Sequence, residues 1–431
     1  MQKKKKPTKD YEDTAVAKKP KTDADQNKEA HAFIEALRKS GYIGDSSKKI
    51  DCIPTGSWVI NRLIGDGTLQ DKPGGVPRGG ITEVCGDEAT GKTTLGLSIS
   101  KQAQSMGGCV VYADFAQTLR TQRQYVENMG VNVNPPNFIH LIPTNFEDGV
   151  QIIGQSLIKL RPSLIVIDDV TSMISKATLE GSPDDPMQIG IHARLTGHFL
   201  NWMSKKLPKY NCALLLLNQM RSAIKGQYDP GPKEVSSGGR AVRFFSTVRI
   251  HLKQTSDREE ISVNSTITGL SEKKAVSQTV KVVVEKNKLD MPFKSGPIYI
   301  TFGRGIDNIM SLIVLGINKK VIKKDAAGWF SWKDPNGELG FKLQGKNSIK
   351  SYLENNANVL DALSPYLMPT QDFKEIDDMQ QQLESKGIDN LSIDEKEQLR
   401  DIRKAKGLPT DDLDFTEDEI SDLAELTGKD E

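Results

Sequence analysis

The feature that most constrains this chain is the pattern G-x-x-x-x-G-K-T at residues 86–93. An apolar run, residues 81–84, comes directly before it, and residues 94–103 have the composition of a helix. A glycine-rich turn between a buried strand and a helix surrounds a phosphate with backbone N–H groups, and the positive end of the helix points at the same anion. The pattern therefore predicts a nucleoside triphosphate site.

The positions of this turn have expected roles. Lys92 is expected to reach the β- and γ-phosphates, and the Thr93 hydroxyl to bind Mg²⁺. A second Mg²⁺ ligand is expected at Asp168, because the apolar run 164–167 ends there in two carboxylates, Asp168 and Asp169. The residues expected around the triphosphate are Gly86, Asp87, Glu88, Ala89, Thr90, Gly91, Lys92 and Thr93.

The middle of the chain repeats this alternation of strand and helix. Further apolar, strand-like runs occur at residues 109–112, 213–217, 247–252 and 279–284, with longer helical stretches between them. Strands that are apolar on both faces are typical of a sheet covered by helices on both sides, so the predicted fold is α/β with a mostly parallel sheet. A chain of 431 residues is long enough for one such domain with appendages.

Charge is distributed unevenly, although 58 Lys and Arg nearly balance 57 Asp and Glu. Residues 1–21 contain eight lysines, three acidic residues and few apolar side chains, which predicts a disordered basic arm. This arm is interpreted either as a solubilising tail or as a nucleic-acid or nuclear-targeting segment. Residues 29–40 follow with apolar side chains at helical spacing. At the other end, residues 409–431 contain ten acidic residues and one lysine.

Cysteine usage and hydropathy restrict the environment of the chain. The four cysteines are far apart and match no zinc or disulfide spacing, so reduced thiols are expected. No apolar run is long enough to span a bilayer, and no apolar segment follows the basic start. A soluble, cytoplasmic protein is therefore expected.

An ordered set of further motifs resembles the RecA family of strand-exchange ATPases, in its bacterial form and its phage UvsX type. The set runs in the family's order over residues 28–367, which makes it more specific than the phosphate-binding pattern alone. Its segments are residues 53–57, 180–181, 189–194, 214–221, 236–241, 282–288, 303–306, 328–330 and 345–347.

The resemblance implies a RecA-type core with a short N-terminal helix and a small α+β C-terminal domain. The helix could dock on its own domain or on a neighbouring subunit, and the core would carry two DNA-binding loops, residues 180–194 and 220–238. The implied boundaries are 1–27 for the disordered arm, 28–45 for the N-terminal helix, 46–305 for the ATPase core, 306–367 for the C-terminal domain and 368–431 for a polar to acidic tail, with a helix around 372–386.

The resemblance also implies site residues. Gln219 would sense the γ-phosphate from a strand end, and Lys286 and Lys288 would reach the ATP of a neighbouring subunit. Thr94, Arg123 and Tyr125 would join the nucleotide site. Loop 220–238 is net basic, which suits a phosphate backbone. The implied DNA-binding residues are Arg194, Arg221, Lys225, Lys233, Gly238, Gly239, Arg240 and Arg243.

One position departs from the family pattern. Members place a glutamate that activates water in an Asp-x-Glu pattern after the second strand, but here Asp114 is followed by Phe115, Ala116 and Gln117. Neither alanine nor glutamine can take a proton from water at neutral pH. Three explanations stay open: a slipped alignment, weak hydrolysis, or a substitute carboxylate, for which Asp169 is the best candidate.

Together with the nucleotide site, the resemblance implies an ATP- and Mg²⁺-dependent recombinase that forms filaments on single-stranded DNA and pairs it with duplex DNA. The expected partners are both forms of DNA, further copies of this chain, and single-strand-binding or loader proteins. One alternative is a recombination mediator that binds ATP with little hydrolysis. A ring helicase on the same core is the other, and the C-terminal motifs disfavour it.

Overall fold

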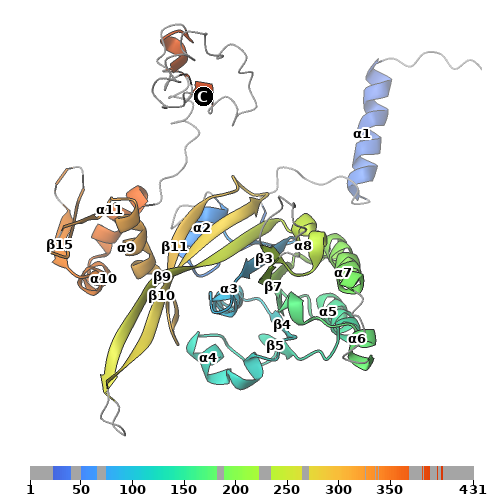
Figure 1. The fold of residues 1–431 in the computed structure, drawn as a ribbon. Helices are drawn as coiled ribbons and strands as arrows, with labels where there is room; N and C mark the ends of the chain where they lie inside the picture. The colour runs from blue at the N-terminus through green and yellow to red at the C-terminus, as the bar shows by residue number, and fades with distance from the viewer. Residues whose placement is uncertain are drawn as a thin grey trace, which may run out of the picture. The chain divides into compact units, whose positions relative to one another are not determined.

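The computed structural model describes residues 23–39, 50–65, 74–181, 189–222, 234–264, 271–325, 327–334, 336–337, 339–367 and several positions between 381 and 400. The chain divides into two compact units, residues 1–50 and 51–431 (Figure 1). Most of the predicted basic arm and acidic tail, and most of the helix expected around 372–386, lie outside the described residues.

Helix α1 (Asp23–Lys39) belongs to the first unit. It begins within the segment predicted to be disordered, at residues 1–27, and so earlier than the predicted helix at 28–45. Phe33 and Ile34 are 64% and 38% exposed, so the helix has uncovered apolar side chains.

A ten-stranded sheet forms the centre of the second unit. Its strands are β3 (Ile81–Gly86), β4 (Val110–Asp114), β5 (Phe138–Leu141), β6 (Leu164–Asp168), β7 (Ala213–Ser222), β8 (Glu234–Ser236), β9 (Val248–Asn264), β10 (Ser271–Asn287), β11 (Ser295–Thr301) and β12 (Gly305–Asp307). The order is β12-β11-β10-β9-β3-β7-β6-β4-β5, with β8 paired to β7. The pairings from β9 to β5 are parallel and those from β9 to β12 antiparallel, which confirms the predicted mostly parallel sheet.

Helices cover both faces of this sheet. Along β7, Ala213, Leu215 and Leu217 pack in an apolar cluster with α3 (Lys92–Ser105), whereas Leu214 and Leu216 pack with α5 (Phe146–Leu160) and α7 (Ile189–Tyr210). All five side chains are at most 1% exposed, as expected for a doubly covered strand. The shorter elements are β1 (Cys52–Ile53), α2 (Trp58–Ile64), β2 (Val76–Pro77), η1 (Leu119–Thr121), α4 (Arg123–Asn128), η2 (Val170–Ser172), α6 (Lys176–Glu180) and α8 (Gly239–Phe245).

Strands β9 and β10 form a hairpin that projects from the sheet (Figure 1). Each has 17 residues, so the predicted strands 247–252 and 279–284 cover only its root. Beyond Leu252 the sequence is polar, and a projecting two-stranded ribbon needs no continuous apolar run. An apolar pattern therefore could not reveal the outer half of the hairpin.

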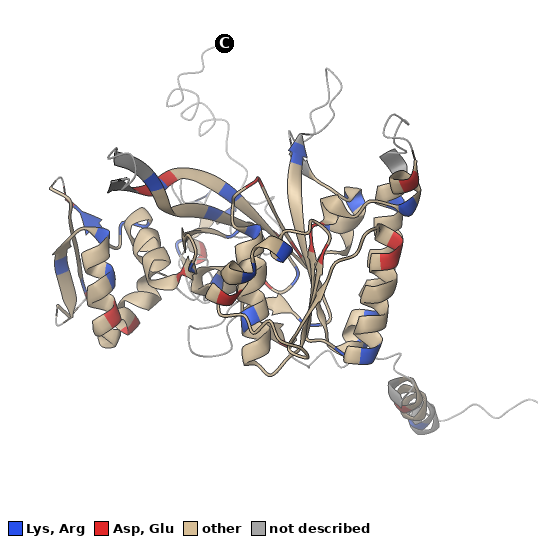
Figure 2. Cartoon of the chain, turned by 90° about the horizontal axis from the view of Figure 1, so that it is seen from below, with Lys and Arg blue, Asp and Glu red and all other residues tan. Residues whose placement is uncertain are grey.

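A C-terminal module follows β12. It consists of α9 (Asn308–Asn318), β13 (Lys323–Lys324), β14 (Trp329–Lys333), β15 (Gly340–Gln344), α10 (Lys346–Asn355) and α11 (Ala357–Leu367). Its apolar residues continue the cluster that contains α3. Lys and Arg are spread over the module and the core, with acidic residues among them (Figure 2). No described helix combines the length and the apolar character needed to cross a membrane.

Candidate nucleotide and DNA site

The phosphate-binding turn lies between β3 and α3, as the sequence predicts. Gly91 precedes α3 with a left-handed φ of 88°. This φ favours glycine, and a Cβ atom there would also lie 2.5 Å from Ile300 Cδ1, which would have to move. Gln278 on β10 donates from Nε2 to the Ala89 carbonyl at 2.7 Å and ties the turn to the hairpin, a contact that sequence reasoning missed.

Lys92 is folded over its own turn. Its Nζ donates to the carbonyls of Gly86 at 3.0 Å and of Asp87 at 2.6 Å. Burial lowers the pKa of Lys92, and the nearby carboxylates of Asp169 and Asp168 oppose that shift. The ammonium is therefore held where the turn would present it to a phosphate.

Thr93 and Asp168 meet, as expected of two ligands of one metal ion. The Thr93 hydroxyl donates to Asp168 Oδ2 at 3.0 Å, and the Tyr112 hydroxyl on β4 donates to the same oxygen at 2.7 Å. Burial raises the pKa of Asp168 to about 6, and the hydrogen bonds from Tyr112 and Thr93 partly offset it. A hydroxyl and a carboxylate are hard oxygen donors, which fit Mg²⁺ completed by phosphate and water oxygens.

Tyr112 was not identified from the sequence. In the sequence it lies in an apolar run, which predicts only a strand residue. In the structure its side chain is fully buried. A tyrosine in such a run was nevertheless a usable signal, because a buried phenol hydroxyl requires a hydrogen-bond partner.

Asp169 is 3% exposed and both of its carboxylate oxygens are occupied. Oδ1 accepts from the Ser172 backbone N–H at 2.8 Å, and Oδ2 accepts from Gln219 Nε2 at 2.7 Å. Gln219 was predicted at a strand end, but it lies inside β7, opposite Gly86 of β3. The strand continues past it because residues 220–222 pair with β8.

The position expected for a catalytic glutamate borders the metal site. The Ala116 backbone N–H donates to the Asp168 carbonyl at 3.1 Å. Asp114, by contrast, is fully buried and accepts from the backbone N–H groups of Thr118 and Leu119 at 3.0 and 2.9 Å. Asp114 therefore shapes the turn, and Ala116 contributes no group that could activate water.

Tyr125 contacts the helix that follows the phosphate-binding turn, whereas Arg123 contacts a residue of its own helix. The Tyr125 hydroxyl lies 2.6 Å from Thr94 Oγ1 on α3. Arg123 is 74% exposed at its side chain and pairs with Glu127 at 2.9 Å, as helix neighbours do. Its assignment to the nucleotide gains no support from this contact.

The two described ends of loop 220–238, the predicted second DNA-binding loop, are fixed to the core. Met220 and Arg221 pair with Ser236 and Val235. Asn218 Nδ2 donates to the Ser237 carbonyl at 2.8 Å and to Glu83 Oε1 at 2.9 Å. Among the predicted DNA-binding residues, Arg194, Arg221, Gly239 and Arg240 are exposed, Arg243 is half-buried and Gly238 is buried, while Lys225 and Lys233 lie outside the described residues.

The two lysines expected to reach a neighbouring subunit differ. Lys286 Nζ donates to the carbonyls of Arg243 at 2.6 Å and Phe244 at 3.0 Å, at the end of α8. Burial lowers the pKa of Lys286, and the charge of Lys288 adds to that shift. Lys288 is exposed to solvent, whereas the ammonium of Lys286 is bound to backbone carbonyls.

Comparison with known proteins identifies the family. Residues 33–307 match the model of the RecA N-terminal domain. The RecA protein of Thermus aquaticus is 33% identical over 74% of this chain and 86% of its own length. The RecA protein of Nautilia profundicola is 34% identical over 71% and 79%, and that of Lactobacillus johnsonii 30% identical over 84% and 88%.

The chain belongs to the RecA family. RecA-family proteins are P-loop ATPases that bind DNA and act in recombination and repair. The contacts of Lys92, Thr93 and Asp168 are consistent with this class of ATPase, and the resemblance inferred from the sequence is confirmed.

Proposed function

We propose that this chain is an ATP-dependent recombinase that assembles on single-stranded DNA and promotes homologous pairing and strand exchange. The observation that supports this most directly is the hydrogen bond from Gln219 to Asp169. Gln219 lies opposite Gly86 of the phosphate-binding turn, and the next residues of β7 form one end of the DNA loop. A shift of Gln219 toward a γ-phosphate would therefore move the base of that loop directly.

The same residues suggest how ATP is held. Thr93 and Asp168 would bind Mg²⁺, which would neutralise charge on the β- and γ-phosphates. Lys92 would exchange its two backbone carbonyl partners for phosphate oxygens, since an ammonium binds an anion more strongly than neutral carbonyls. Tyr125 would border the nucleotide beside Thr94.

Asp169 is the proposed substitute for the absent glutamate. It lies next to Asp168, is nearly fully buried and contacts the side chain that we assign to the γ-phosphate. A carboxylate in this place can accept a proton from an attacking water if Gln219 moves away from it.

A second candidate function is a mediator that binds ATP and DNA but hydrolyses ATP slowly. Ala116 favours it, because this position borders Asp168 and has no acid or base. In that case ATP binding alone would set the DNA-bound state.

Assembly into a helical filament is part of the proposal. The exposed Phe33 and Ile34 of α1 provide an apolar surface that a second copy could cover, and Lys288 is free to extend toward a neighbour's ATP. Single-strand-binding or loader proteins remain proposed partners.

A strand-exchange assay tests the function. The full chain is incubated with circular single-stranded and linear duplex DNA, with ATP or a non-hydrolysable analogue, and complexes are imaged by electron microscopy. A recombinase produces joint molecules and filaments with ATP, and Lys92→Ala produces neither. Filaments without joint molecules in either nucleotide would indicate the mediator, and rings would contradict both.

A further inference from the structure

Strand β10 contains one extra residue directly before the lysine pair. Val284 pairs with Ile250 of β9, and Lys286 pairs with Arg249, so Glu285 has no partner of its own on β9. An extra residue of this kind bends the strand and re-aims the side chains that follow it. Because side chains alternate between the two faces of a strand, loss of the extra residue would turn Lys286 and Lys288 to the opposite face.

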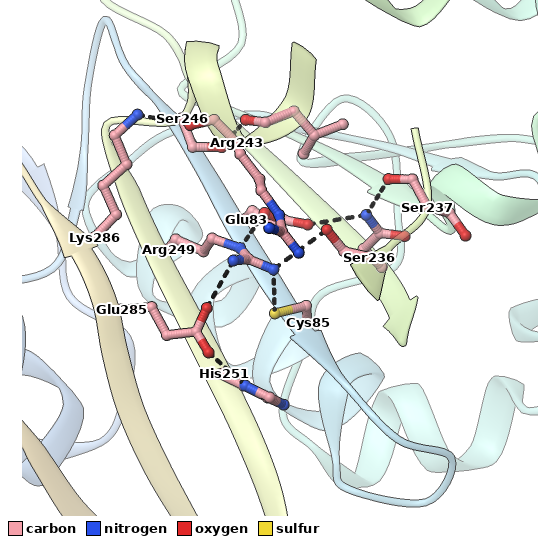
Figure 3. A network of polar contacts seen from close by, with 12 residues as sticks. Glu83, Cys85, Ser236, Ser237, Arg243, Ser246, Arg249, His251, Glu285 and Lys286 are labelled. Carbon is pink, nitrogen blue, oxygen red and sulfur yellow. Dashed lines mark hydrogen bonds and ion pairs between the residues drawn. The ribbon is translucent and has the colours of Figure 1, made fainter. Parts of the chain in front are cut away.

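The carboxylate of Glu285 is held by two side chains from β9 (Figure 3). Oε2 accepts from Arg249 Nη1 at 2.7 Å, and Oε1 lies 2.7 Å from His251 Nδ1. Arg249 and His251 are two residues apart and thus on one face of β9, where both reach a single carboxylate. The hydrogen bond from His251 lowers the pKa of Glu285, with Arg249 acting in the same direction.

Arg249 is fixed in turn by the phosphate-binding strand and the DNA loop. Its Nε donates to Glu83 Oε2 at 2.7 Å, and Glu83 is fully buried on β3. Its Nη2 lies 3.3 Å from Ser236 Oγ at the base of the loop. The clamp on Glu285 is therefore anchored to both sites rather than to the surface.

The lysines that follow are aimed consistently with this bulge. Lys286 extends to the last carbonyls of α8, and Lys288, two residues further, lies exposed beyond it. The backbone N–H of Lys288 donates to the Thr247 carbonyl at 3.0 Å, which fixes the chain on both sides of Asn287.

We propose that Glu285 is a positioning residue, whose carboxylate, held between Arg249 and His251, maintains the bulge that aims Lys286 and Lys288. This inference rests on the proposed function, in which the lysines act on the ATP of a neighbouring subunit. Misplacing a catalytic group by about 1 Å can lower turnover on the order of 10²-fold.

Steady-state kinetics of the full chain with single-stranded DNA and ATP test the role. Glu285→Ala is expected to lower kcat at least tenfold while nucleotide affinity without DNA stays within about twofold, because its own phosphate-binding turn is intact. Glu285→Gln keeps an acceptor for Arg249 and should retain most of the activity. The matched control is Glu260→Ala on the exposed part of the same hairpin, which should behave as the wild type.

A double variant separates positioning from general damage. If Glu285 acts through Lys288, adding Glu285→Ala to the Lys288→Ala protein causes no further loss of kcat. The inference is overturned if the fold-losses of kcat in the two single variants multiply in the double variant. It is also overturned if Glu285→Ala has a normal kcat while Lys288→Ala is impaired. Normal kcat in both Lys286→Ala and Lys288→Ala would refute the proposed role of the lysines and the inference with it. Should Glu285→Ala unfold, His251→Ala, which removes one of the two side chains that hold the same carboxylate, gives the same comparison in the Lys288→Ala background.

Discussion

Asp168 gives the site a pH dependence that can be stated with its sign. Burial raises the pKa of this carboxyl to about 6, above its ordinary value, so the group is ionised at pH 7 and becomes protonated as the pH falls through 6. A protonated carboxyl is a poor Mg²⁺ ligand. We expect the Mg²⁺-dependent part of nucleotide affinity to be about tenfold weaker at pH 5 than above pH 7, measured by Mg²⁺ titration of a fluorescent nucleotide complex.

Tyr112→Phe is the control for this titration. The Tyr112 hydroxyl lowers the pKa of Asp168, so its removal should move the midpoint to higher pH, while the nucleotide's own protonation is the same in both proteins. Identical midpoints in the two proteins would show that the Tyr112 contact does not tune the metal ligand.

Asp169→Asn tests the proposed base. The amide has the shape of the carboxylate but cannot accept a proton from water, so turnover should fall by about 10²-fold while nucleotide binding is nearly unchanged. Ala116→Glu should raise turnover, since position 116 borders Asp168. Turnover and nucleotide affinity are measured separately, and normal hydrolysis by Asp169→Asn would refute the substitution.

At the residue scale, the sequence revealed the groups that belong to a compact motif. Lys92 and Thr93 could be placed because strand–turn–helix geometry fixes their spacing, and Asp168 because it ends a buried apolar strand. Tyr112, Gln278 and the partners of Glu285 could not, because their contacts join strands far apart in the sequence and depend on register.

At the scale of elements, we expect the start of α8 to be sensitive to substitution because it follows the proposed DNA loop 220–238. Gly238 has a φ of 84°, and a Cβ atom there would lie 2.6 Å from Val242 Cγ2. Gly107 has a similar φ of 77°, but a Cβ atom there would have no atom within 4 Å. Gly107→Ala therefore measures only the cost of placing a side chain on a left-handed backbone, about 1–2 kcal/mol. Gly238→Ala should therefore destabilise the protein more than Gly107→Ala, as measured by urea denaturation.

The same pair of variants separates stability from DNA binding. Gly238→Ala should also weaken single-stranded DNA binding in fluorescence anisotropy, because the loop ends at this residue, whereas Gly107→Ala should not. Equal DNA affinity in the two variants would show that α8 does not position the loop.

The elements themselves were predictable where burial imposes a pattern. Strands β3, β4 and β6 are apolar on both faces and were predicted within two residues of their ends, whereas β5, at the edge of the parallel sheet and only partly buried, was missed. The outer hairpin and the early start of α1 were also missed, since solvent-exposed segments carry little hydrophobic periodicity.

For the whole molecule, the opposite charges of the two ends lead to a prediction about DNA binding. The acidic residues of 409–431 outnumber its single lysine ten to one, so this segment can compete with phosphate for basic surface. Deleting 409–431 should tighten binding, most clearly for duplex DNA at low salt. Deleting 1–21 should reduce the salt dependence by about 0.7 in log–log slope for each lost contact to single strands.

A salt titration of DNA affinity for the full-length and truncated proteins measures both effects. Unchanged affinity at low salt after removal of 409–431 would indicate that this segment does not shield the DNA site and would favour a role in docking a partner protein.

The length of the β9–β10 hairpin has a consequence for the behaviour of the protein in concentrated solution. Within the hairpin, only Ser277–Val283 of β10 pair with β11 and only Val248–Leu252 of β9 pair with β3, so the outer ribbon has two open edges among the described strands. Open edges readily recruit other strands and lead to aggregation. Register irregularities at Ala275/Ser277 and Gln278/Val280 interrupt this ladder, and such irregularities twist an edge away from a regular partner. Long exposed strands are thereby compatible with the self-association proposed for this chain.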